Sequence, residues 1–232
     1  MKKFFAKKQG DFFILDGDEL AHFNVLRCKA DEEVVVLGAD GFDYLCKVEK
    51  VTKKQATLSV ISKSKNTKNP KINISLFQGL VKGEKLDLIV QKLTELGITS
   101  LYTFESEYTI AKSNNNKIDR LNRVSCEACK QCGRSTPLNI FESISFKDML
   151  VKLKEYDIVL FANEKDRIRN LTKLNACNNI AIIVGSEGGF SDSEIEQIHG
   201  INAVNFGLGE RILRAETAAI ATSAIVAYMA DV

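Results

Sequence analysis

The 232-residue sequence lacks any long hydrophobic run, and this absence limits the class of protein to which it can belong. No apolar stretch reaches the roughly 18 residues that a bilayer-spanning helix needs. The most apolar segment, residues 218–230, contains Thr222, Ser223 and Tyr228 and is typical of a buried helix. The first residues are basic, as in a signal peptide, but their apolar stretch ends at Lys7 and is too short for a secretory core. We therefore expect a cytoplasmic protein with no membrane partner.

Metal ligands are also scarce. The only histidines, His22 and His199, lie in different parts of the chain and predict neither a zinc site nor a catalytic triad. The six cysteines are expected to be reduced thiols. Cys126, Cys129 and Cys132 have the spacing C-x-x-C-x-x-C, but on one helix the first and third would point about 120° apart and lie about 9 Å apart along the axis. The remaining ligand and the trailing proline of ferredoxin motifs are missing, so we expect no metal.

The net charge of +2 is too small to indicate a partner, but the lysines are unevenly distributed. Residues 46–68 contain seven lysines and one glutamate, and the first eight residues contain four more lysines. A basic face of this kind suits a polyanion such as RNA. A solvated lysine-rich surface explains the same charge equally well.

A change of pattern near Pro70 divides the sequence into two domains. Before it, residues 34–51 contain two β-rich runs around a turn, which predicts a hairpin. The polar and basic segment 62–70 breaks this periodicity and predicts a linker. After the linker, strands alternate with helices, which predicts an α/β domain with a mainly parallel sheet. We therefore expect a small barrel-like β domain at residues 1–68 and an α/β domain at residues 69–232.

Two glycine-rich loops follow predicted strands in the last third of the chain. They are residues 185–191, after a buried strand, and residues 207–211, after the last strand. Loops at the carboxyl ends of parallel strands are where α/β proteins bind ligands, and glycine lets the backbone approach a ligand closely. Neither loop has the sequence of a P-loop or the spacing of a dinucleotide-binding motif. Tight turns and a ligand cradle both remain open, and the presence of two such loops favours the cradle.

The last helix begins with charged residues, although the rest of it is almost entirely apolar. Glu216 in the first turn is favourable for the helix dipole, which is a sufficient structural explanation. Arg211 and Arg214 gain nothing from that dipole. Binding of RNA phosphate or of a developing negative charge would explain them.

Together these segments resemble the carboxyl-terminal signature of the 16S rRNA (uracil-N3)-methyltransferases, a branch of the SPOUT superfamily. The matching sequences are GSEGGFSDSEI at residues 185–195 and FGLGERILRAETAAI at residues 206–220. In one departure, Ser186 stands where the family usually has proline, which removes a rigid turn residue but no chemical group. The resemblance covers nearly the whole chain, because similar motifs occur upstream as HFNVLR at 22–27, QGLVKGEK at 78–85, QKLTELG at 91–97 and CEACKQCGR at 126–134.

The resemblance implies a PUA-like β-barrel followed by a SPOUT-type, trefoil-knotted α/β domain, in a homodimer with its active site near the subunit interface. It also implies S-adenosylmethionine as methyl donor, S-adenosylhomocysteine as product, no metal, and methylation of N3 of uridine 1498 in 16S rRNA of the small ribosomal subunit. Three loops would form the cofactor slot. The residues assigned to it are Leu160, Gly185, Glu187, Gly188, Gly189, Leu208, Gly209, Ile212, Leu213, Ala215 and Thr217.

The reaction requires that uracil N3 lose the proton that it carries at neutral pH. We expect Glu216 to act as the base, directly or through water, and Arg214 to face the uracil oxygens as a cation. Glu187 is a weaker candidate for the base because it could equally shape its loop. Two alternatives remain: a SPOUT methyltransferase for another RNA, such as a tRNA ribose, and a non-catalytic RNA-binding protein of ribosome assembly. The residues expected to contact RNA are His22, Arg27, Lys82, Arg134 and Arg211.

Overall fold

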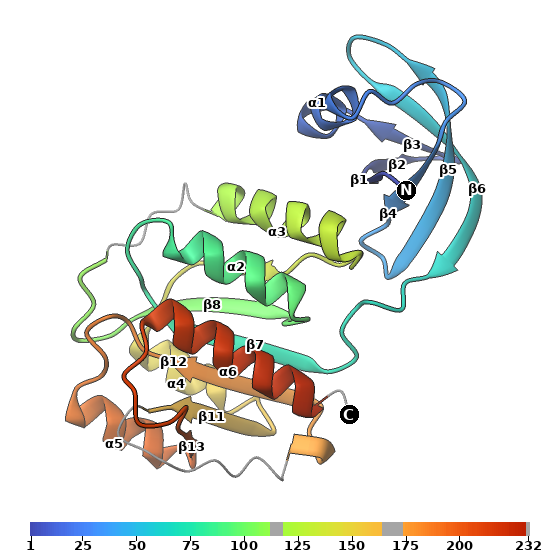
Figure 1. The fold of residues 1–232 in the computed structure, drawn as a ribbon. Coiled ribbons are helices and arrows are strands. Elements are labelled where there is room, and N and C mark those ends of the chain that lie inside the picture. The colour runs from blue at the N-terminus through green and yellow to red at the C-terminus, as the bar shows by residue number, and fades with distance from the viewer. Residues whose placement is uncertain (112–117, 164–173, 231–232) are drawn as a thin grey trace. The chain divides into compact units, whose positions relative to one another are not determined.

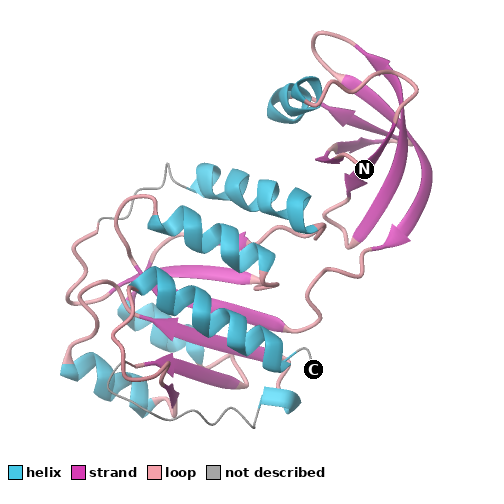
Figure 2. Ribbon diagram, viewed as in Figure 1, coloured by secondary structure: helices cyan, strands magenta, loops and turns pink. Residues whose placement is uncertain are grey.

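The computed structural model describes residues 1–111, 118–163 and 174–230, and these residues form two compact units (Figures 1 and 2). The first unit consists of Met1–Asn69 together with Cys126–Pro137, and the second consists of Pro70–Ser125 together with Leu138–Val232. The chain thus passes from one unit to the other close to residue 69. Residues 126–137, which the sequence pattern assigns to the second domain, pack within the first unit.

The first unit is a curled, mostly antiparallel sheet around a small core. Its strand order is β1-β4-β5-β6-β3-β2, in which only β1 and β4 pair in parallel. Phe4, Leu15, Phe23 and Leu58 are fully buried at its centre. The elements are β1 (Lys3–Phe5), β2 (Lys7–Gln9), β3 (Phe12–Leu15), α1 (Gly17–Val25), β4 (Glu33–Leu37), β5 (Phe42–Val51) and β6 (Ala56–Lys65).

The predicted linker begins too early, because β6 continues to Lys65. Residues 62–65 pair with residues 42–45 of β5, although the side chains at the end of β6 are exposed. A strand that buries neither face shows no apolar periodicity, so its pairing depends on the backbone of its neighbour. Asn66 then closes this end of the unit by donating hydrogen bonds to Asp43 at 2.9 Å and to the Gly133 carbonyl at 2.8 Å.

The second unit contains a parallel sheet, as the alternation of strands and helices predicts. Its order is β10-β8-β7-β12-β11-β13, with β9 pairing beside β8, and every pairing between these strands is parallel. The strands are β7 (Asn73–Gly79), β8 (Ser100–Glu105), β9 (Asn139–Ile140), β10 (Ile144–Ser145), β11 (Ile158–Ala162), β12 (Asn179–Val184) and β13 (Val204–Phe206).

Helices cover both faces of this sheet (Figure 1). Leu76 and Ile182 point to one face and share a core with α2 and α6, whereas Phe77 and Ile183 point to the other and pack with α4 and α5. Because both faces are covered, the central strands β7 and β12 are buried along almost their whole length rather than at alternate residues. The helices of the unit are α2 (Lys85–Glu95), α4 (Phe146–Leu153), α5 (Asp192–Gly200) and α6 (Ala215–Ala230), with a 3₁₀ turn at Leu174–Ala176, and α3 (Ile118–Cys132) runs from this unit into the first.

This architecture confirms the fold class predicted from the sequence, an α/β domain with a mainly parallel sheet preceded by a small β domain. The loop that the resemblance expects after Leu160 is described only as far as Asn163. Within the described residues, no helix combines the length and the apolarity that crossing a bilayer requires.

Candidate active site

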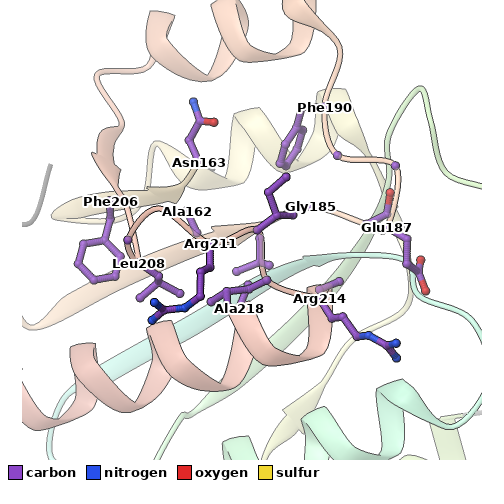
Figure 3. Close-up of a pocket in the computed structure, with 18 of the residues that line it drawn as sticks. Ala162, Asn163, Gly185, Glu187, Phe190, Phe206, Leu208, Arg211, Arg214 and Ala218 are labelled. Carbon is purple, nitrogen blue, oxygen red and sulfur yellow. The ribbon is translucent and has the colours of Figure 1, made fainter. Parts of the chain in front are cut away.

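A pocket of about 510 Å³ lies where β11, β12 and β13 end (Figure 3). Parallel strands bring their carboxyl ends to the same edge of a sheet, so the loops that follow them meet there. Segments from all three loops and from the start of α6 line the pocket. The lining residues are Lys85, Ala162, Asn163, Val184, Gly185, Ser186, Glu187, Gly188, Gly189, Phe190, Ile195, Phe206, Leu208, Gly209, Arg211, Ile212, Leu213, Arg214, Ala215 and Ala218.

The glycine loop after β12 is held by the end of the neighbouring strand β7. The fully buried Gln78 donates from Nε2 to the Gly185 carbonyl at 2.9 Å and to the Gly79 carbonyl at 3.0 Å. A Cβ on Gly79 would collide with the Ser186 nitrogen and would lie 2.8 Å from the Gly185 carbonyl carbon. Only glycine at residue 79 therefore permits the two backbones to lie this close.

The turn within this loop forms without the proline that the family usually has. Ser186 forms an isolated β-bridge with Gly189, whose N–H donates to the Ser186 carbonyl at 3.1 Å. Gly189 has a φ of +70°, a conformation that glycine adopts without strain. The backbone bond and the glycine therefore set the turn, and Ser186 is compatible with it.

The far end of the loop is anchored by a capping box at the start of α5. Ser191 Oγ accepts from the Glu194 N–H at 3.3 Å, and Glu194 Oε2 accepts from the Ser191 N–H at 3.0 Å. The other carboxylate oxygen of Glu194 accepts from the Glu107 N–H at 2.8 Å. One buried side chain thus joins the start of α5 to the loop that follows β8.

Lys85 brings two carboxylates together, a role that was not among those expected from the sequence. Its Nζ lies 2.8 Å from Glu187 Oε1 and 3.5 Å from Glu216 Oε2, so α2, the glycine loop and α6 meet at one ammonium group. A signal for this role is present in the sequence. Lys85 is the first residue of α2, where the helix dipole disfavours a cation, so a stabilising role in the helix does not explain it.

The 2.8 Å contact between Lys85 and Glu187 shifts the pKa of both groups. Partial burial alone would raise the pKa of Glu187, but the hydrogen bond from Lys85 and those from backbone N–H groups outweigh it, and the pKa is lowered. The hydrogen bond to Glu187 raises the pKa of Lys85. Glu187 is therefore a poor proton acceptor near neutral pH.

Glu216, Arg211 and Arg214 differ in their burial and in their contacts with other residues. The Glu216 side chain is 13% exposed, and its Oε2 atom makes no hydrogen bond with any residue that the structure describes. Arg211 and Arg214 are exposed, and neither forms an ion pair within the described part of the chain. Figure 3 shows Arg214 extending on the Glu187 side of the pocket and Arg211 on the side of Phe206 and Leu208.

Two residues assigned to the cofactor do not line the pocket. Leu160 is fully buried within β11, and the end of that strand contributes Ala162 and Asn163 instead. Thr217 is exposed on α6 and also lies outside the lining. The structure brings together the others: Gly185, Glu187, Gly188, Gly189, Leu208, Gly209, Ile212, Leu213 and Ala215.

The residues expected to contact RNA are divided between the two units. In the second unit, Lys82 and Arg211 are exposed. In the first, Arg27 is exposed with a φ of +52°, whereas His22 packs edge-on against the Phe4 ring. Arg134 does not fit the expected contact with RNA. It is 3% exposed, and burial lowers the pKa of its guanidinium. A guanidinium so enclosed has no access to an RNA phosphate.

The cysteines of α3 behave as packed thiols. The Sγ atoms of Cys129 and Cys132 lie 3.7 Å and 3.8 Å from the Thr136 and Cys129 carbonyl oxygens, within reach of weak S–H hydrogen bonds. Burial raises the pKa of Cys126 to about 11, which keeps it protonated. All six cysteines are free, and the described residues contain no group of three or more side chains arranged to hold a metal ion.

Comparison with known proteins identifies relatives along the whole chain. A family model described as an RNA methyltransferase domain matches residues 67–227, and one described as an RNA methyltransferase PUA domain matches residues 15–61. Ribosomal RNA small subunit methyltransferase E from Rickettsia conorii is 31% identical, over 91% of this chain and 88% of its own. The protein of the same name from Bacillus subtilis is 27% identical, over 94% and 91%.

A solved structure has the same fold. The crystal structure of a ribosomal RNA small subunit methyltransferase E from Neisseria gonorrhoeae, bound to S-adenosyl methionine, superposes with a TM-score of 0.89. The two sequences are 25% identical, and the match covers 99% of this chain and 98% of that one. The likeness therefore includes both units of the chain.

Proposed function

Because the chain belongs to the ribosomal RNA small subunit methyltransferase E family, we propose that it transfers a methyl group from S-adenosylmethionine to N3 of a uridine in 16S ribosomal RNA, uridine 1498 by resemblance. The observation that carries this proposal is the pocket at the ends of β11, β12 and β13. It combines glycine backbone, apolar walls and two arginines without ion pairs among the described residues, and the largely buried carboxylate of Glu216 lies beside it.

The pocket fits a cofactor of this size and chemistry. Its volume of about 510 Å³ lies within the range of roughly 300–1,000 Å³ for small-molecule sites. Val184, Leu208 and Leu213 offer apolar contacts to a planar base, and the glycine loop offers backbone groups without side chains in the way. Glu187 offers a carboxylate to the positively charged end. When bound, S-adenosylmethionine supplies an electrophilic methyl group on a sulfonium, so the chemistry requires no metal.

The protein's own contribution begins with removal of a proton from the substrate. Uracil N3 becomes a nucleophile when its N–H bond breaks, and we assign Glu216 as the acceptor of that proton, directly or through one water. Its Oε2 atom is buried and has no hydrogen bond with the described residues, so it retains the capacity to accept one. Lys85 Nζ lies 3.5 Å from this oxygen and ties the start of α6 to the start of α2, which holds the carboxylate in place.

The second contribution is stabilisation of the anion that remains. Loss of the N3 proton places negative charge on the uracil oxygens, and Arg214 is the cation assigned to face them. Arg214 lines the pocket and forms no ion pair within the described residues, so it can bind the substrate without first breaking a contact. Glu187, with its lowered pKa and its bond to Lys85, shapes the loop rather than serving as base.

Exposed cations bind the RNA backbone in this proposal. Arg27 of the first unit and Lys82 and Arg211 of the second bind phosphates, so affinity for RNA should fall steeply with salt. The target base leaves its stack to reach the cofactor. The protein works in the cytoplasm as a homodimer. A monomer mass in light scattering at working concentration would contradict the dimer.

Nucleoside analysis tests the assignment directly. Small-subunit RNA and tRNA from cells with and without the gene are digested separately and examined by mass spectrometry. We expect 3-methyluridine in the small-subunit RNA to be lost with the gene and restored by it. A missing 2′-O-methyl nucleoside in tRNA instead would favour the ribose alternative. No change in any methylated nucleoside, together with no heat of S-adenosylmethionine binding in calorimetry, would favour the non-catalytic alternative.

A further inference from the structure

An exposed tyrosine lies directly beside the glycine loop of the pocket. Tyr108, in the loop after β8, is 49% exposed. Its backbone packs so closely on Gly188 that a Cβ placed on Gly188 would lie 2.7 Å from the Tyr108 Cβ and 2.8 Å from the Tyr108 carbonyl oxygen. Because Gly188 lines the pocket, the tyrosine side chain leaves the backbone at the pocket wall.

Hydrogen bonds of its neighbours hold the backbone of Tyr108 in place. The Ser106 N–H donates to Thr109 Oγ1 at 2.8 Å, and the Thr109 N–H donates to the Ser106 carbonyl at 3.0 Å, which closes a turn around Tyr108. The Glu107 N–H donates to Glu194 at the start of α5. None of these bonds involves the phenol ring, so the ring can be changed without removing them.

The ring itself contributes little to the packing of the domain. A structural tyrosine normally buries its ring and finds a partner for its hydroxyl. Tyr108 belongs to neither hydrophobic cluster of its unit, and it makes no side-chain hydrogen bond or ring contact with any residue in the described part of the chain. An exposed aromatic ring on a fixed backbone at the edge of a pocket is available to a ligand.

We propose that Tyr108 is a stacking platform for an unpaired base of the RNA substrate, an inference that rests on the function proposed above. Proteins bind single-stranded RNA with aromatic rings that stack on bases and with cations that pair with phosphates. Tyr108 supplies the ring beside the glycine loop, and Arg211 supplies an exposed cation at the same pocket. The platform sets how the strand enters and has no contact with the methyl donor.

Steady-state kinetics of the full-length protein on small-subunit RNA test this role. Loss of one stacked base lowers affinity roughly 5- to 150-fold. We therefore expect Tyr108→Ala to raise the KM for RNA at least about fivefold, while the calorimetric Kd for S-adenosylmethionine stays that of the unchanged protein. Tyr108→Phe keeps the ring and should retain the original KM.

A control and a second variant make the result decisive. Phe141 is an aromatic residue of similar exposure, 42%, which stacks on Tyr102 rather than on the glycine loop, so Phe141→Ala should leave the KM for RNA unchanged. If Tyr108→Ala melts early, Tyr108→Leu replaces it and should show the same rise in KM. An unchanged KM in the variant without a ring, or an equal loss in Tyr108→Phe, overturns the platform. Failure of the proposed function differs from both, because the unchanged protein would then not methylate the RNA at all.

Discussion

The ammonium nitrogen of Lys85 lies 3.5 Å from a buried carboxylate oxygen of Glu216, so the first turns of α2 and α6 meet at the pocket. The same nitrogen is bonded to Glu187 of the glycine loop. Removal of the ammonium would leave two carboxylates facing one another with no cation between them. The contact therefore predicts that the alignment of the whole site depends on Lys85.

We expect Lys85→Met to slow single-turnover methylation at least about tenfold, because small misplacements of catalytic groups cost factors of this size or more. Lys85→Arg keeps the charge and should recover most of the rate. Lys92→Met, at the other end of α2, removes a lysine that pairs with Glu95 and serves as the control. A wild-type rate in Lys85→Met would show that the pairing does not align the site.

The pH dependence of stability should report the Lys85–Glu187 pair. Folding lowers the pKa of Glu187, so its carboxylate stabilises the folded state above the ordinary glutamate pKa of about 4.3, and this contribution is lost as the pH falls through the lowered pKa. Lys85, with a raised pKa, stays charged throughout this range. Glu187→Gln should therefore melt below the unchanged protein at pH 7, and the difference should shrink once the pH falls below the lowered pKa of Glu187.

Melting curves of Glu196→Gln provide the comparison for that experiment. Glu196 is an exposed residue of α5 that forms no ion pair with another described residue. Its substitution should give the same small difference in Tm at both pH values. A Glu187→Gln difference that persists unchanged at low pH would mean that the carboxylate does not contribute through its charge.

The close approach of β7 to the glycine loop predicts a specific effect of a single methyl group. In Gly79→Ala the new Cβ would meet the backbone of Gly185 and Ser186, which cannot move aside as a flexible side chain can. Overpacking of this kind costs about 1–3 kcal/mol, so we expect a lower free energy of unfolding in urea and weaker binding of S-adenosylmethionine. Gly200→Ala is the matched control, because a Cβ there has no atom within 4 Å.

The sequence reveals those parts of this site that lie close together along the chain. The loops after β12 and β13 and the charged start of α6 are local patterns, so the sequence identified most of the pocket. Lys85 and Gln78 reach it from elements about a hundred positions earlier, and only the sheet order β7-β12 brings them there. No local sequence pattern predicts that these two residues lie beside the glycine loop.

Other differences arise where the sequence does not record how far an element extends or how deeply it is buried. Leu160 and Asn163 both belong to the region around the end of β11, but only the strand's final residues reach the pocket. Arg134 has the residue type of an RNA contact and is buried in the structure. The polar end of β6 has the sequence of a linker, because its residues pair with β5 through the backbone and their side chains are exposed.

Glu216→Gln tests the proton acceptor with little change of shape. The amide cannot take up a proton, so single-turnover methylation at saturating cofactor should fall about 10²- to 10⁴-fold, the usual contribution of a general base. Binding of S-adenosylmethionine should be retained, because Glu216 does not line the pocket. A rate within threefold of the unchanged enzyme, with a flat pH profile, would remove Glu216 from the chemistry.

Arg214 and Arg211 leave the same loop on different sides of the pocket, and this separation predicts different kinetic effects (Figure 3). Arg214 is assigned to the anion that forms on the uracil, so Arg214→Ala should lower the single-turnover rate about 10²-fold or more at saturating RNA and cofactor. Arg211 is assigned to phosphate, so Arg211→Ala should raise the KM for RNA, reduce its salt dependence and leave the saturated rate intact. The two variants control for each other, since both delete one exposed guanidinium from one loop. A normal saturated rate in Arg214→Ala would exclude it from the reaction, and equal effects of the two variants would mean that both arginines act only by holding RNA.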